Sequence, residues 1–118
     1  MIIVSGIQSS GKLHVGNYLG AVKNWLEFQK DPSNQCYFFL ADWHSLTEQY
    51  DVATKAAQVR GLAIELLALG IDPQRIALFR QSDLPEHLEL AWYLTCVTPV
   101  AEMERMTQYK DKAGRGHS

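Results

Sequence analysis

The sequence contains little cysteine, no excess of positive charge and no long hydrophobic run. Its 2 cysteines cannot build a disulfide framework, and both stand in apolar runs, which is typical of buried free thiols in a reducing cytoplasm. The 11 basic and 13 acidic residues give a net charge of −2, so no extended positive field attracts nucleic acid or anionic lipid. No apolar run approaches the roughly 18 residues of a membrane helix. We therefore expect a cytoplasmic protein with no membrane contact.

Strand-like and helix-like segments alternate along the chain. Short apolar segments at residues 1–5, 37–41 and 76–79 predict strands, and the unbroken run at 37–41 is typical of a parallel strand covered on both faces. Helical spacing of apolar residues predicts helices over 16–29, 52–69 and 85–98. Asp51 is placed to cap the second helix, Gly70 to end it and Pro99 to stop the third.

This alternation indicates an α/β fold with right-handed crossovers and a parallel sheet flanked by helices. Ligands of such folds bind at the carboxyl ends of the strands, here from Gly6, Asp42 and Gln81 onward. We expect a single domain, a further helix over 100–112 and a terminal loop over 113–118. Three strands would leave an unpaired sheet edge, which suggests a truncated domain.

The segment between the first strand and the first helix concentrates polar chemistry. Residues 6–17 hold three glycines, two serines, a lysine and a histidine. Glycines let the backbone approach an anion closely, and the N–H groups at a helix start favour negative charge. Phosphate is the ligand that this composition favours. The alternative is a tight turn in which Ser9 and Ser10 only cap the helix.

Residues 6–12 also satisfy the pattern G-x-x-x-x-G-K of a P-loop, and 37–42 imitate the strand that ends in a magnesium-binding aspartate. The residue after the lysine should then be Ser or Thr, because its hydroxyl contacts magnesium. Leu13 stands there and cannot make that contact. The P-loop interpretation is therefore the weaker one.

Leu13-His14-Val15-Gly16-Asn17 resembles the HIGH signature of the class I aminoacyl-tRNA synthetases. The flanking residues 6–11 and 18–21 resemble the version found in tryptophanyl-tRNA synthetases, in which asparagine replaces the final histidine. Further blocks resemble that family in order along the whole chain: Asp42-Trp43-His44, Leu69-Gly70-Ile71-Asp72-Pro73, Phe79-Arg80-Gln81-Ser82 and residues 104–112.

The resemblance implies a Rossmann-like, incomplete nucleotide-binding fold of the HUP type, with residues 1–118 as the N-terminal part of the catalytic domain. It implies ATP-dependent activation of L-tryptophan to the adenylate and transfer to tRNA(Trp). ATP would enter as its Mg²⁺ complex, with no tightly bound cofactor and no protein metal site. The intact enzyme is expected to be a homodimer.

The resemblance also assigns roles to residues. His14 and Asn17 would be the catalytic donors, with His14 donating to phosphate as charge develops. Gly16 would leave room for adenine or ribose. The residues expected to contact ATP are Gln8, Ser9, Ser10, Gly16, Asn17, Lys110 and Lys112. Ser9 stands where the family usually has proline. His44 would approach the amino-acid pocket, or else make a structural contact with Asp42.

Two parts of the family's site have no counterpart in the sequence. These are the KMSKS signature and the aspartate that recognises the indole nitrogen, so we expect the 118-residue chain alone to be inactive. The alternative function is a non-catalytic nucleotide-binding or docking module, which would bind a partner subunit through its unfinished sheet edge and its last helix.

Overall fold

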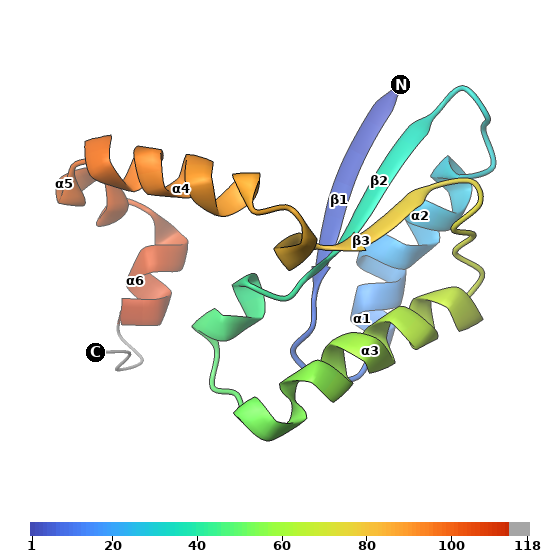
Figure 1. The fold of residues 1–118 in the computed structure, drawn as a ribbon, viewed down its shortest axis with the longest axis horizontal. Coiled ribbons are helices and arrows are strands. Elements are labelled where there is room, and N and C mark those ends of the chain that lie inside the picture. Colours follow the sequence, from blue (N-terminus) through green and yellow to red (C-terminus); the bar gives the residue numbers. More distant parts are fainter. Residues whose placement is uncertain (114–118) are drawn as a thin grey trace. The chain divides into compact units, whose positions relative to one another are not determined.

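The structure, a computed structural model, describes residues 1–113 and divides the chain into two compact units, residues 1–83 and residues 84 onward (Figure 1). Each unit is described here by itself. No helix within residues 1–113 is long and apolar enough to cross a membrane.

The first unit is built on a three-stranded parallel sheet. Its strands are β1 (Ile2–Gln8), β2 (Gln35–Ala41) and β3 (Ala77–Arg80), in the order β1-β2-β3. Gln8 pairs with Ala41, so the carboxyl ends of the first two strands meet at one edge of the sheet. The expected α/β fold with a parallel sheet and flanking helices is confirmed.

The first strand is longer than the sequence indicated. We expected it to end before Gly6, but Gly6 lies inside β1 and pairs with Phe39 of β2. A Cβ at Gly6 would collide with the Phe39 ring, so the absence of a side chain serves close packing and not a turn. The polar loop therefore begins at Ser9.

The helices of the first unit form largely as predicted. Residues 15–28 are continuously helical through α1 (Val15–Asn17), a π-helical turn η1 (Tyr18–Val22) and α2 (Lys23–Phe28). In α3 (Val52–Ala68) the Asp51 carboxylate accepts the Ala53 N–H at 2.9 Å, and Gly70 follows the helix with φ +103°. Both caps of α3 are thus confirmed.

The two crossover helices, α2 and α3, pack on the same face of the sheet. The strand order β1-β2-β3 means that both crossovers move the chain in the same direction across the sheet, and right-handed crossovers of this kind place their helices on one face. The Trp25 ring of α2 stacks on Phe38 of β2, with centroids 4.4 Å apart and an interplanar angle of 9°. On the other face Tyr37 is 41% exposed, so the expectation that β2 is covered on both faces is wrong for this unit. The buried cluster consists of Ile7, Val22, Trp25, Cys36, Phe38, Leu40, Leu62, Leu66, Ile71 and Ile76.

The second unit is helical. It contains α4 (Glu86–Val97), α5 (Val100–Met103) and α6 (Thr107–Ala113), so the helix expected over 100–112 is interrupted at 104–106. α4 has no buried residue, and Cys96 is exposed. The expectation of a buried thiol is therefore wrong for Cys96 and confirmed for Cys36. Of the loop expected over 113–118, Ala113 belongs to α6, and residues 114–118 lie outside the described residues.

Candidate functional site

A hollow of about 200 Å³ opens at the carboxyl end of β1. It is smaller than the roughly 300 Å³ at which pockets begin to enclose a whole small ligand, so it accommodates part of one, such as a phosphate group with its neighbouring atoms. Three of the residues expected to contact ATP, Gln8, Ser10 and Asn17, are brought together there with the expected catalytic donor His14. The hollow is lined by Gln8, Ser10, Gly11, Lys12, Leu13, His14, Asn17 and Leu62.

His14 is held at the start of the helix by a reciprocal pair of hydrogen bonds. The Gly16 N–H donates to Nδ1 of His14 at 3.1 Å, and the His14 N–H donates to Oδ1 of Asn17 at 3.2 Å. A backbone N–H can only donate, so Nδ1 is the acceptor and the neutral ring carries its proton on Nε2. The His14 ring therefore offers an Nε2–H donor, and Asn17 retains its Nδ2 amide donors.

Gly16 provides space for the histidine ring. A Cβ at Gly16 would lie 3.0 Å from both Cε1 and Nδ1 of His14, which is tighter than ordinary side-chain packing. The expected role of Gly16, room for adenine or ribose, stays a prediction. The structure adds that the same glycine lets the His14 ring lie against the backbone.

Ser9 lies behind the loop. It is fully buried, and its hydroxyl donates to Oγ of Ser45 at 3.2 Å, which in turn donates to the Asp42 carbonyl at 2.5 Å. Ser9 is not among the residues that line the hollow. Contact of Ser9 with ATP remains a prediction, but its hydroxyl is engaged in holding the loop to the end of β2.

The backbone of this loop differs from what a P-loop requires. A P-loop directs consecutive N–H groups at phosphate, whereas here the Leu13 N–H donates to the Glu65 carboxylate of α3 at 2.9 Å. The glycine that would open the P-loop, Gly6, is inside β1. Both observations agree with the sequence argument from Leu13 against a P-loop.

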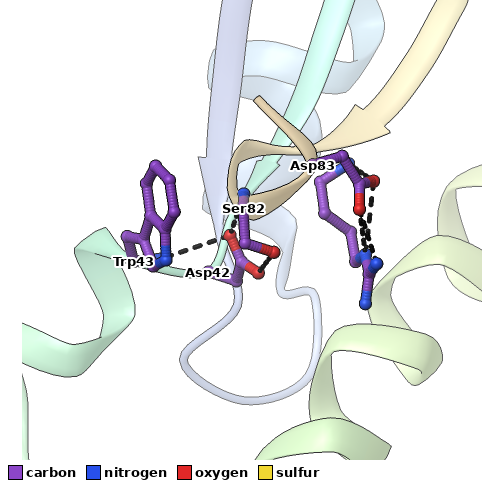
Figure 2. Close-up of polar contacts among 5 residues, drawn as sticks. Asp42, Trp43, Ser82 and Asp83 are labelled. Carbon is purple, nitrogen blue, oxygen red and sulfur yellow. Dashed lines mark hydrogen bonds and ion pairs between the residues drawn. The ribbon is translucent and has the colours of Figure 1, made fainter. Parts of the chain in front are cut away.

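Asp42 and His44 follow β2 and contact different partners. The Asp42 carboxylate accepts the N–H of Ser82 at 3.0 Å and its Oγ–H at 2.5 Å (Figure 2). It also accepts the Trp43 N–H at 3.1 Å, whereas Nδ1 of the exposed His44 lies 3.0 Å from Oε1 of Gln81. The structural contact between Asp42 and His44 that the sequence left open is therefore not formed. Asp42 binds Ser82 instead, and His44 contacts Gln81. The place of His44 in an amino-acid pocket stays a prediction.

Asp83 lies beside this network (Figure 2). Its carboxylate forms a separate ion pair with Arg80. The hydrogen bond from the Arg80 guanidinium lowers the pKa of the Asp83 carboxyl below its ordinary value of 3.8, and the same contact raises the pKa of Arg80. Both side chains are more than 40% exposed, at 57% and 42%, so solvent screens the pair.

The second unit carries the two predicted lysines. Lys110 and Lys112 belong to α6, and the Lys110 side chain is exposed. Their contact with ATP stays a prediction.

Two residues that contact the loop were missed in the sequence. Lys55 and Glu65 of α3 bond to the backbone of Ser9 and Leu13. Lys55 could have been found from its position four residues before Val59, on the apolar face of α3. An ammonium group on a face that is partly buried needs a hydrogen-bond acceptor. No comparable signal marks Glu65.

The parallel sheet, the flanking helices and the polar loop at the carboxyl end of the first strand define an α/β protein with a Rossmann-like fold. A family model described as "tRNA synthetases class I (W and Y)" matches residues 1–117. The chain belongs to this family of class I tRNA synthetases.

Relatives within the family have related sequences and structures. The chain is 49% identical over 116 residues to the tryptophan–tRNA ligase of Rickettsia bellii, covering 96% of this chain and 34% of that protein. It is 44% identical over 114 residues to that of Agrobacterium fabrum, covering 97% of this chain and 32% of that protein. The crystal structure of Campylobacter jejuni tryptophanyl-tRNA synthetase complexed with ADP and tryptophan superposes with a TM-score of 0.87 at 39% identity, covering 100% of this chain and 36% of that one. The chain thus spans about a third of the length of these relatives.

Proposed function

We propose that this chain provides the ATP-binding part of a tryptophan–tRNA ligase. In that reaction a carboxylate oxygen of L-tryptophan attacks the α-phosphorus of ATP, and the bond to the bridging oxygen breaks as pyrophosphate leaves. The terminal ribose hydroxyl of tRNA(Trp) then attacks the carbonyl carbon of the adenylate, and AMP leaves. Family membership and the Campylobacter relative, which holds ADP and tryptophan, support this proposal.

One observation carries the proposal at the level of side chains. The Gly16 N–H bonds to Nδ1 of His14 and so leaves Nε2–H as a fixed donor beside the hollow. Reactions at phosphorus need little covalent help from the protein, so an oriented donor that meets developing negative charge is the contribution expected here. Gln8, Ser10 and Asn17 line the same hollow and can bind the neighbouring parts of ATP, which enters with Mg²⁺.

The remaining roles belong to the same proposal. Lys110 and Lys112 would reach the phosphates of ATP, Gly16 would admit the sugar or base, and His44 would approach tryptophan. A cytoplasmic location is supported by the free, buried thiol of Cys36.

A chimera tests the function directly. It joins residues 1–118 to the remaining part of the Rickettsia bellii ligase, to which this chain is 49% identical. We expect tryptophan-dependent exchange of pyrophosphate into ATP, reduced by about 10² when His14 is changed to Ala and little changed when Lys12 is changed to Ala. A folded chimera without exchange would contradict the proposal. The 118-residue chain alone should show no exchange.

A second candidate is the docking module. α4 exposes large apolar side chains, among them Trp92 at 67% and Leu94 at 54%, which is typical of a contact surface. The same surface suits homodimerisation of an intact ligase. Sedimentation of the 118-residue chain tests this candidate: a folded monomer that captures no partner would count against it.

A further inference from the structure

Helix α3 contacts both ends of the polar loop that joins β1 to α1 (residues 9–14), called here the nucleotide loop. At the first end, Nζ of Lys55 donates to the Ser9 carbonyl at 3.0 Å. At the second end, a carboxylate oxygen of Glu65 accepts the Leu13 N–H at 2.9 Å. Both contacts are partly buried and join segments far apart in the sequence. The two side chains leave α3 about 15 Å apart along its axis, so they hold the loop at two separate points.

The Lys55 contact sets the direction of a donor in the hollow. In a planar trans peptide unit the C=O and the N–H point in opposite directions. Because Lys55 draws the Ser9 carbonyl toward α3, the N–H of Ser10, which belongs to the same peptide unit, points away from that helix. Ser10 also lines the hollow, so an N–H on this side of the loop is available to a ligand there. The Lys55 ammonium also lies 5.7 Å from the centroid of the Tyr50 ring, which further restricts its position.

The Glu65 contact fixes the peptide unit that joins Lys12 to Leu13, one unit before the one that enters His14. Leu13 is half-buried and packs against the core, and its N–H is bonded to Glu65. This peptide determines where the chain enters the helix, and therefore where the His14 ring meets the Gly16 N–H. Hydrogen bonds to a charged carboxylate are stronger than neutral ones, so Glu65 is well suited to hold this point.

We propose that Lys55 and Glu65 are positioning residues of the nucleotide site. Lys55 directs the Ser10 N–H toward ATP, and Glu65 keeps His14 in its capping position. Neither side chain needs to touch the nucleotide. This inference rests on the proposed function, because it concerns the same loop and the same ligand.

The test uses the 118-residue chain and two readouts. The first is hydrogen exchange and the chemical shift of the Ser10 and Leu13 amides, measured by NMR. The second is the dissociation constant for ATP in the presence of Mg²⁺. The variants are Lys55→Met and Glu65→Ala, with the conservative variants Lys55→Arg and Glu65→Gln, which retain a donor and an acceptor. Arg60→Met, an exposed position between the two on the same helix, is the matched control.

Glu65→Ala should speed exchange of the Leu13 amide, and Lys55→Met should shift the Ser10 amide. Both should weaken ATP binding by about tenfold, the loss expected for a hydrogen bond to a charged group. Lys55→Arg and Glu65→Gln should recover most of that loss, and Arg60→Met should resemble the wild type. General destabilisation would not produce recovery of this kind.

Two results would overturn the inference. One is unchanged ATP affinity in folded Lys55→Met and Glu65→Ala chains, and the other is a loss that the conservative variants do not recover. If the wild-type chain does not bind ATP, the ATP-binding part of the proposed function fails. The positioning role is then tested by amide hydrogen exchange alone. A Leu13 amide that is protected in the wild type and loses protection in Glu65→Ala supports that role, and an unprotected Leu13 amide refutes it.

Discussion

The carboxylate of Asp42, at the end of β2, accepts both the N–H and the hydroxyl of Ser82, at 3.0 and 2.5 Å. Ser82 follows β3, so this pair joins the carboxyl ends of two neighbouring strands. The same aspartate accepts the Trp43 N–H, and the Asp42 carbonyl accepts the hydroxyl of Ser45, which accepts that of Ser9. Asp42 is therefore the centre of a network that connects the ends of all three strands.

Removal of this carboxylate should destabilise the first unit. Asp42→Ala leaves the partly buried donors of Ser82 and Trp43 without their acceptor, which should lower the free energy of unfolding by about 1–3 kcal/mol. Urea unfolding measures this change. Asp83→Ala removes the exposed carboxylate of the residue next to Ser82 and is the matched control, with little effect expected. Equal losses of unfolding free energy in the two variants would show that the Asp42 hydrogen bonds stabilise the first unit no more than an exposed carboxylate does.

The Arg80–Asp83 pair should make a pH-dependent contribution to stability. The Arg80 hydrogen bond lowers the pKa of Asp83 in the folded state below 3.8. A lowered pKa means that the contribution is fully present above about pH 3.8 and is lost as the pH falls through the folded-state value. The stability difference between the wild type and Asp83→Asn should therefore be small but measurable at pH 6 and should vanish toward pH 2. A difference that grows on acidification would contradict this assignment.

The two cysteines should differ sharply in reactivity. Cys36 is 4% exposed, and burial raises the pKa of its thiol, so little reactive thiolate is available, whereas Cys96 is exposed. A thiol reagent at pH 8 should modify Cys96 quickly and Cys36 only as fast as the first unit opens. The Cys96→Ser chain isolates Cys36, and unfolding in urea should abolish its protection. Comparable rates in the native chain would be inconsistent with the buried position of Cys36.

The stacked pair of Trp25 and Phe38 should be the most sensitive point of the core. Trp25 is 2% exposed, so Trp25→Ala should cost about 3–5 kcal/mol of unfolding free energy. Trp92 is 67% exposed, and Trp92→Ala is the control for loss of an indole without loss of packing. Urea unfolding followed by circular dichroism compares the two. A tolerant Trp25 would mean that the first unit does not depend on this contact.

Local signals predicted much of this fold. The Asp51 cap, the glycine after α3 and the alternation of strands and helices depend on neighbouring residues, and each is confirmed. The sequence predicts that the first strand ends before Gly6, because a glycine after a short apolar run usually marks a turn. The actual role of Gly6 comes from Phe39 on the adjacent strand, a contact that only the sheet register creates.

The site was predicted less completely than the fold. The resemblance identified residues of the loop, and the structure gathers Gln8, Ser10, His14 and Asn17 around one hollow. The residues that hold the loop, Lys55 and Glu65, lie on a helix that is distant in the sequence. Hydrogen bonds between distant segments produce almost no pattern in the spacing of residues along the sequence. For the same reason, the sequence did not indicate that Asp42 contacts Ser82.

The most direct test of the whole account is a titration of the 118-residue chain with ATP and Mg²⁺, comparing the wild type, His14→Ala and Lys12→Ala. The proposed function has the Nε2–H of His14 donating to phosphate, so His14→Ala should weaken binding by about tenfold or more, and Lys12→Ala should have little effect. The opposite order, with binding lost in Lys12→Ala and retained in His14→Ala, is what a P-loop would give and would contradict the account.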